Sequence, residues 1–176
     1  YEITYGDWSS DVCSSDLEAV ALAAGFAAAV AEATGRLREG HGQDPLQPLR
    51  DRLLRELLQL PGVRLTGPDP SESERRLPHH ISLVVADRQD RPLSGRALVR
   101  AMARYGFAVS SGSACSGNHG LAASPVLLAM GYSPEEAGAG LRISLGPWNR
   151  PEDLQTLPQV LAQARDELEA AAGVAP

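Results

Sequence analysis

Apolar residues recur with helical spacing along much of the chain. In an alanine-rich segment over residues 18–38, Leu22, Phe26 and Val30 stand four residues apart, which predicts a helix with one apolar stripe. Leucines recur every three or four positions over residues 46–60, up to a Pro-Gly pair. This pattern predicts a second, amphipathic helix that ends at the pair.

From residue 94 onwards, the spacing of apolar residues and the capping residues predict one long helix and three short ones. The long helix begins at Pro151, and Pro158 is expected to break or kink it because proline lacks the amide donor. Ser94 is a plausible N-cap for a helix that ends at Gly106. Two short helices are predicted over 124–130 and 134–139. The residues predicted to face inward from the long helix are Leu154, Leu157, Leu161, Ala164 and Leu168.

Short apolar runs between the helices predict four strands, over 63–65, 80–86, 107–109 and 141–145. The run HISLVVA at 80–86 is β-branched and continuous, which is typical of a buried strand. Four short strands that alternate with helices predict an α/β or α+β layer fold, with helices packed on a small sheet.

Composition and charge exclude several classes of protein. The chain has 176 residues, 43% hydrophobic and 22% charged, which is ordinary for a folded domain and excludes a disordered chain. A net charge of −6 argues against nucleic-acid or anionic-membrane binding. There is no run of eighteen uncharged apolar residues and no secretion signal, so neither a membrane span nor export is expected. All 16 basic residues are arginines, so chemistry that needs a lysine amine is excluded for this chain alone.

The first seventeen residues differ in composition from the rest. Residues 7–17 read DWSSDVCSSDL, which resembles the translation of a sequencing adapter, so residues 1–17 are predicted to be non-native and Cys13 to have no role. The alternative is a native polar loop. We therefore expect three parts: the non-native residues 1–17, a helix within 18–45 that leads in from an upstream domain, and a small C-terminal domain over 46–176.

Cys115 is the strongest candidate for chemistry. Two cysteines in unlike surroundings indicate reduced thiols in a cytosolic protein, and no CxxC pair supports a structural zinc site. Cys115 follows a predicted strand within SSGSACSG, where serine and glycine leave backbone amides free and the thiol accessible. Such a setting favours a nucleophilic thiolate. The alternative is a buried structural cysteine.

Arginine and histidine near the predicted strands offer weaker candidates. Arg142 interrupts the apolar run LRISL, either because alternate strand positions face solvent or because its guanidinium binds a carboxylate. His119 could form a couple with Cys115, although a solvated loop histidine is the simpler account. His79 and His80 adjoin a strand. The glycines around Cys115 form no phosphate-binding fingerprint.

The order SSGSACSG, SPVLLAMGYSPEEA and LRISLG resembles the C-terminal region of a cysteine desulfurase, in the class V aminotransferase-like family of pyridoxal-phosphate enzymes. The upstream pieces LRDRLLRELLQLPGVRLTGP and RLPHHISLVV resemble the entry into the small domain of that family. The resemblance covers residues 18–168. It implies the fold class α/β: the small C-terminal domain of a fold-type-I enzyme, a short-stranded sheet flanked by helices.

The resemblance also implies roles for two residues. Cys115 matches the cysteine that takes sulfur from the substrate L-cysteine as a persulfide, and Arg142 matches the arginine that holds the substrate carboxylate. The parent would be a cytoplasmic homodimer that makes L-alanine and passes sulfur to an acceptor protein, an iron–sulfur scaffold or sulfur carrier, for cluster assembly or tRNA thiolation. Neither direct nucleic-acid contact nor membrane contact is expected.

Two departures from the family limit what this chain can do alone. The pyridoxal 5'-phosphate of the parent needs a lysine that is absent here, so the chain alone is predicted to be inactive and to hold no cofactor-binding residue. The stretch NHGLAASP after Cys115 lacks the Glu-Pro-Ser-His expected there. The alternatives are a non-catalytic sulfur-carrier or interaction module, and another class V aminotransferase or lyase.

Overall fold

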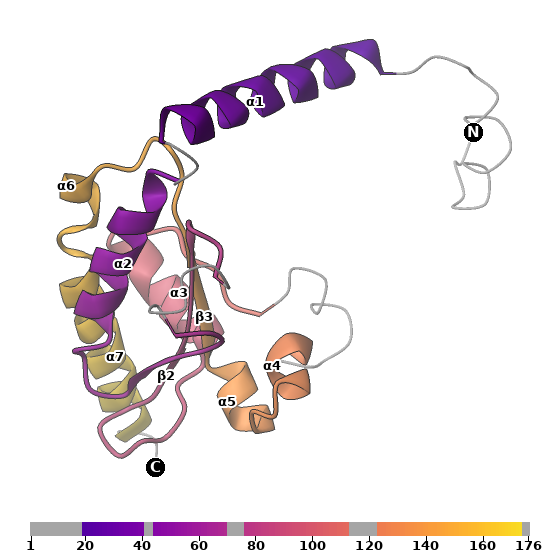
Figure 1. Cartoon of the computed structure of the whole chain (residues 1–176). Helices are drawn as coiled ribbons and strands as arrows, with labels where there is room; N and C mark the ends of the chain where they lie inside the picture. Colours follow the sequence, from indigo (N-terminus) through magenta and orange to yellow (C-terminus); the bar gives the residue numbers. More distant parts are fainter. Residues whose placement is uncertain (1–18, 41–43, 70–75, 113–122, 174–176) are drawn as a thin grey trace, which may run out of the picture. The chain divides into compact units, whose positions relative to one another are not determined.

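The computed structural model describes residues 19–40, 44–69, 76–112 and 123–173. The chain divides into two compact units, Tyr1–Asp44 and Pro45–Pro176. The described part of the first unit is essentially one helix, α1 (Val20–Glu39), shown in indigo in Figure 1. The second unit holds the sheet and the remaining helices.

Helix α1 carries its apolar side chains in exposed positions. None of its residues is buried, and Leu22 and Phe26 are 75% and 73% exposed. Among the described residues it is the one helix with the length and hydropathy of a membrane span, although the sequence pattern predicted none. Its apolar stretch includes the ion pair of Glu32 with Arg36, at 2.5 Å. Length and hydropathy are equally satisfied by a helix that packs on another part of a protein, so we assign α1 to no membrane.

The second unit is built on a three-stranded antiparallel sheet in the order β1-β2-β3. Strand β1 (Val63–Leu65) pairs with β2 (His80–Val85), which pairs with β3 (Gly140–Ser144). In this register the alternate apolar side chains of all three strands point to one face. These residues are Val63, Leu65, Ile81, Leu83, Val85, Leu141 and Ile143.

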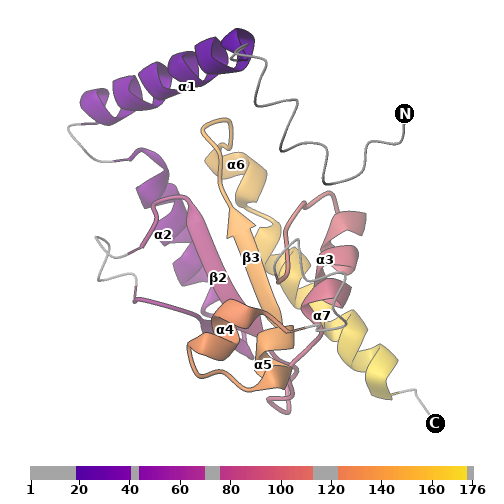
Figure 2. The same ribbon diagram turned by 90° about the vertical axis from the view of Figure 1, so that its right-hand side faces the viewer.

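Three helices cover this apolar face and form the main core. They are α2 (Leu46–Leu57), α3 (Gly95–Arg104) and α7 (Leu157–Gly173), and Figures 1 and 2 show α2 and α7 on the side of the sheet opposite α4 and α5. The apolar faces that the sequence predicted for the helix over residues 46–60 and for the C-terminal helix lie in this core. The core side chains contributed by the helices are Leu53, Leu54, Leu57, Leu98, Ala101, Met102, Leu157, Leu161 and Ala164.

The opposite face of the sheet is covered only in part by the described residues. Two short helices, α4 (Pro125–Ala129) and α5 (Pro134–Gly138), pack over the end of the sheet at Val84. Figure 2 shows them in front of the strands. The rest of this face carries polar side chains, so the expectation that residues 80–86 form a strand buried on both faces is wrong along part of its length: His80 and Ser82 are half-buried.

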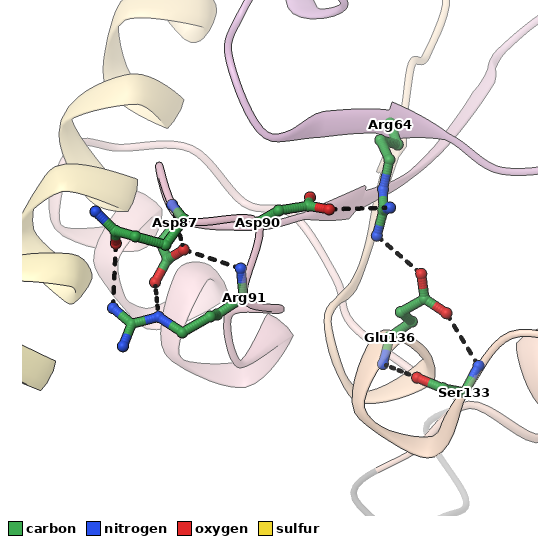
Figure 3. Close-up of polar contacts among 7 residues, drawn as sticks. Arg64, Asp87, Asp90, Arg91, Ser133 and Glu136 are labelled. Atoms are coloured by element: carbon green, nitrogen blue, oxygen red, sulfur yellow. Dashed lines mark hydrogen bonds and ion pairs between the residues drawn. The ribbon is translucent and has the colours of Figure 1, made fainter.

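Helix α5 is fastened to β1 by side-chain contacts (Figure 3). Arg64 on β1 donates from Nη2 to Oε1 of Glu136 at 2.8 Å. The other oxygen of Glu136 accepts the amide of Ser133, and the Ser133 hydroxyl accepts the amide of Glu136, which completes a capping box. The amide of Ser133 and the guanidinium of Arg64 lower the pKa of Glu136.

Several predicted boundaries need correction. Helix α2 ends at Leu57, before the Pro-Gly pair at which it was expected to end. Residues 107–109 do not form a strand. Helix α3 ends at Arg104, the chain turns at Gly106, which has a positive φ of 85°, and of this segment Ser110 alone bridges to β3. The C-terminal helix is divided into α6 (Pro151–Leu154) and α7, as expected, but the break precedes Pro158. Proline is tolerated there because the first turn of a helix has no amide partner to lose.

Candidate functional site

A cleft of about 390 Å³ lies on the partly covered face of the sheet, where α4 leaves strands β2 and β3 exposed. Its floor is formed by polar side chains that alternate with the core residues of the two strands, and its rim includes apolar side chains of α4. The lining residues are Thr66, Gly67, Pro68, Arg76, Leu77, His80, Ser82, Gly112, Ser124, Val126, Leu127, Met130, Gly140 and Arg142.

Arg142 stands in the middle of β3 and lines this cleft. Its neighbours Leu141 and Ile143 are buried in the core, whereas Arg142 is exposed on the opposite face. Within the described ranges, its guanidinium makes no hydrogen bond or ion pair. Strand alternation therefore accounts for its exposure, and no described residue occupies its N–H donors, which face the cleft.

The backbone of Arg142 is also bonded to the segment that leads into residues 113–122. The amide of Arg142 donates to the carbonyl of Ser110 at 2.7 Å, and the amide of Ser110 donates to the carbonyl of Arg142 at 3.0 Å. On the far side of the segment, the amide of Ser124 donates to the carbonyl of Ala137 at 3.0 Å. Both ends of the segment are therefore fixed beside the cleft.

A tight contact between α3 and β3 stabilises this arrangement. A Cβ atom added to Gly95, the first residue of α3, would lie 2.4 Å from the carbonyl oxygen of Gly140 and 3.0 Å from Cβ of Ser111. No larger residue fits at this position without moving the backbone. Gly95 thus allows the start of α3, the start of β3 and Ser111 to lie together at the edge of the site.

Arg76 forms one wall of the cleft. This side chain is 8% exposed, and its Nη2 donates to the carbonyls of Thr66 and Pro68 at 2.7 and 2.6 Å. Burial and the charge of Arg50 lower the pKa of the guanidinium. The hydroxyl of Thr66 donates to that of Ser82 at 2.6 Å, which joins the wall to the floor. The donors of Arg76 are used in holding the protein together, in contrast to those of Arg142.

His80 gives the floor a titratable group. Burial is the main cause that lowers the pKa of its imidazole below the ordinary 6.5, followed by the positive charges of Arg142 and Arg76 and by His79. No aspartate or glutamate is among the described residues that line the cleft. The site is therefore electropositive and suited to a small anion such as a carboxylate.

A second cleft, of about 440 Å³, has different chemistry. It lies at the other edge of β3 and is lined mainly by apolar side chains, including Phe107, Trp148 and Leu154. The charged residue of its described lining is Asp153, whose pKa is lowered by the amide of Arg150. An anion is disfavoured there, so the first cleft is the better candidate.

The structure places the predicted residues as follows. Arg142 lies in the cleft, whereas Cys115, His119 and Cys13 fall outside the described residues. The sequence did not single out Arg76, His80 or Ser82 as lining residues. The sequence does contain a pattern that indicates His80 and Ser82 as lining residues, because these two polar residues alternate with Ile81 and Leu83 along the strand.

Cofactor chemistry can be tested against the residues of the chain. No cluster of three or more histidine, cysteine, aspartate or glutamate side chains within the described ranges could hold a metal ion. Pyridoxal phosphate is bound through a lysine imine in the enzymes that use it, and this chain contains no lysine. The residues present do not fit that cofactor.

Comparison with known proteins relates the fold and the site to one family. The model of the aminotransferase class-V family matches residues 17–157, which include α1 and the sheet. A cysteine desulfurase IscS of Clostridium botulinum is 34% identical over 128 residues, 70% of this chain and 30% of that protein. An IscS-like cysteine desulfurase of Mycobacterium tuberculosis is 36% identical over 160 residues, 88% of this chain and 38% of that protein.

Solved structures show the same fold. A NifS-like protein from Rickettsia africae superimposes with a TM-score of 0.53 at 24% identity, over 69% of this chain and 28% of that one. The chain spans about 30% of the length of the curated relatives it matches, so it corresponds to one part of such proteins. By sequence and by fold, the chain belongs to the class V aminotransferase family and is a partial, cysteine desulfurase-like member of it.

Proposed function

We propose that this chain supplies the small-domain half of a cysteine desulfurase active site, in which Arg142 binds the substrate carboxylate and Cys115 accepts the sulfur. The observation that carries the proposal is the guanidinium of Arg142, which has no partner among the described residues, in a cleft whose described lining contains no carboxylate. A guanidinium binds a carboxylate through two parallel N–H···O bonds.

The position of Cys115 in the sequence supports its assignment. It lies five residues after Ser110, whose backbone is bonded to that of Arg142. A chain of five residues spans at most about 18 Å, so the thiol is tethered within reach of the cleft. Sulfur transfer requires this reach, because the nucleophile must meet the substrate that Arg142 holds.

Sulfur transfer to Cys115 would form one S–S bond and break one C–S bond. The thiolate of Cys115 forms an S–S bond with the substrate sulfur while the Cβ–S bond of the substrate breaks. The electron pair of that bond goes to the carbon, which takes up a proton and leaves as L-alanine. Cys115 is left as a persulfide. An acceptor thiol, on an iron–sulfur scaffold or a sulfur-carrier protein, then takes the outer sulfur.

The remaining groups of the active site belong to a longer parent protein, which we propose to be a cytoplasmic homodimer. The chain matches about 30% of its relatives and has no lysine, so the pyridoxal cofactor would be held outside it. The exposed apolar side chains of α1 offer a face that the missing part could cover. For the chain on its own there is a second candidate function, a sulfur-carrier module without catalysis. The absence of lysine is consistent with that function too.

Carboxylate binding by the 176-residue chain tests the proposal. L-Alanine should shift the NMR amide signals of Arg142 and Ser82, whereas alaninamide, which lacks the carboxylate, should not. Arg142→Gln should abolish the shifts, and Ser144→Ala, on the same face of β3, should retain them. Equal shifts with alaninamide, or with Arg142→Gln, would show that the cleft does not recognise a carboxylate through Arg142.

A further inference from the structure

His80 and Arg142 lie on the same face of two paired strands. In the register of β2 and β3, His80 is opposite Ser144 and Arg142 is opposite Ser82, so His80 and Arg142 are diagonal neighbours. Side chains at such positions come within reach of each other when they are long. Both line the cleft. A ligand bound by the guanidinium therefore lies beside the imidazole.

Among the described residues, the groups that act on His80 are basic or neutral. They are Arg142 on β3, Arg76 on the segment that precedes β2, and the neighbouring His79. Asp69 acts on Arg76 and does not line the cleft. The positive charges of Arg142 and Arg76 disfavour a third, so they help burial to lower the pKa of the imidazole. A bound carboxylate places a negative charge beside His80 and therefore favours the protonated imidazole.

We propose that His80 is a second residue of the carboxylate subsite, and that its protonated imidazolium donates a hydrogen bond to the carboxylate that Arg142 binds. The inference rests on the proposed function, because it requires Arg142 to hold a carboxylate. The proton is taken from solvent when the ligand binds. His80 thereby makes the affinity for the amino-acid substrate depend on pH over the range in which histidine titrates.

The direction of the pH dependence follows from linkage. If the ligand raises the pKa of His80, the protonated protein binds the ligand more tightly, and affinity increases as the pH falls. The interaction of the imidazolium with the carboxylate sets both the gain in affinity and the rise in the pKa of His80. We therefore expect about three- to tenfold tighter binding of L-alanine at about pH 5.5 than at about pH 8. Neither group of L-alanine titrates between these pH values.

The experiment measures L-alanine binding to the 176-residue chain by NMR at both pH values, for the parent sequence and two variants. His80→Gln keeps a hydrogen-bonding side chain but removes the charge, and should bind with the weaker affinity at both pH values. His79→Gln is the matched control, because His79 is adjacent but does not line the cleft; it should keep the full pH dependence.

A second measurement needs no variant. The ring signals of His80 are titrated with and without L-alanine, and the pKa of His80 should rise when L-alanine is bound. If L-alanine shifts Arg142 but leaves the pKa of His80 and the affinity independent of pH, the role of His80 is disproved and that of Arg142 stands. If L-alanine shifts neither residue, the carboxylate site itself is disproved, and the role of His80 with it.

Discussion

Ser110 and Arg142 exchange two backbone hydrogen bonds, with N···O distances of 3.0 and 2.7 Å, across a bridge that lies outside the regular strand pairing. The bridge joins the residue proposed to bind the carboxylate to the segment that carries the proposed sulfur acceptor. Arg142 thus has two structural partners: the strand β2, which aligns it in the sheet, and Ser110, which fixes where the next segment begins.

Replacing Ser110 by proline should weaken this link. Proline removes the amide that donates to the carbonyl of Arg142, and loss of one such bond costs about 1 kcal/mol of unfolding free energy. The amide of Arg142 should then exchange faster with deuterium. Ser110→Ala retains both backbone bonds and should behave as the parent sequence. Unchanged protection of Arg142 in Ser110→Pro would show that the bridge does not hold the segment.

Removing the guanidinium of Arg142 should impair substrate binding in the restored full-length enzyme. Arg142→Ala loses a charge-assisted pair worth about 1.5–3 kcal/mol, so the KM for L-cysteine should rise by about tenfold or more. Cofactor absorbance should stay, because the role proposed for Arg142 is contact with the substrate and not with the cofactor. Ser144→Ala is the control on the same strand face. A KM that is unchanged in Arg142→Ala would make Arg142 a surface residue of the strand.

Most of the fold could be predicted from the sequence, because the core elements carry their own periodic patterns. The leucine spacing of α2, the cap at Ser94 and the β-branched run of β2 each gave the correct element. The strand predicted over residues 107–109 did not form. Only Ser110 pairs with β3, and the preceding residues line the second cleft instead. Local pattern does not determine which strand edges are paired.

The candidate site was predictable only in part. Arg142 stood out because it interrupts an apolar strand, whereas Arg76 belongs to the wall of the cleft through bonds to the carbonyls of Thr66 and Pro68, which only the folded chain brings near. His80 was named only as a histidine adjoining a strand, and it was not placed in a site because the strand was expected to be buried. The partial cover provided by α4 and α5 leaves that part of the face open.

The isolated chain should show no covalent cofactor. With no lysine it has no side-chain amine to form a stable imine with pyridoxal phosphate, so the protein mixed with this cofactor and then desalted should have no imine absorbance band. The restored full-length protein is the positive control: treated in the same way, it should show the imine band. A stable imine band in the 176-residue chain would contradict the division of the active site proposed here.

Acid should destabilise the domain partly through Asp87. Burial opposes its ionisation, but the amides of Arg91 and Gln89 and the guanidinium of Arg91 outweigh burial and lower its pKa below the ordinary 3.8. A lowered pKa in the folded state gives stability that is present above about pH 4 and is lost as the pH falls through the folded value. Figure 3 shows these contacts.

Urea unfolding at about pH 7 and about pH 3 tests this expectation. Asp87→Asn should lower the unfolding free energy at the higher pH and should reduce its dependence on pH. Asp90→Asn is the control, because Asp90 is an exposed residue whose contact with Arg64 is long, at 3.8 Å, and asparagine tolerates its positive φ of 61°. Equal effects of the two substitutions would show that the contacts of Asp87 do not stabilise the fold.

The central claim, that this part of a desulfurase accepts sulfur at Cys115, is tested most directly by mass spectrometry. The restored full-length enzyme is incubated with L-cysteine, and the peptide that carries Cys115 is compared before and after. Its mass should increase by one sulfur atom, and reducing agent should reverse the increase. Cys115→Ser should carry no added sulfur, whereas Cys13→Ser should leave the persulfide and the yield of L-alanine unchanged. Transferable sulfur and L-alanine formed by Cys115→Ser at the parental rate would contradict the account.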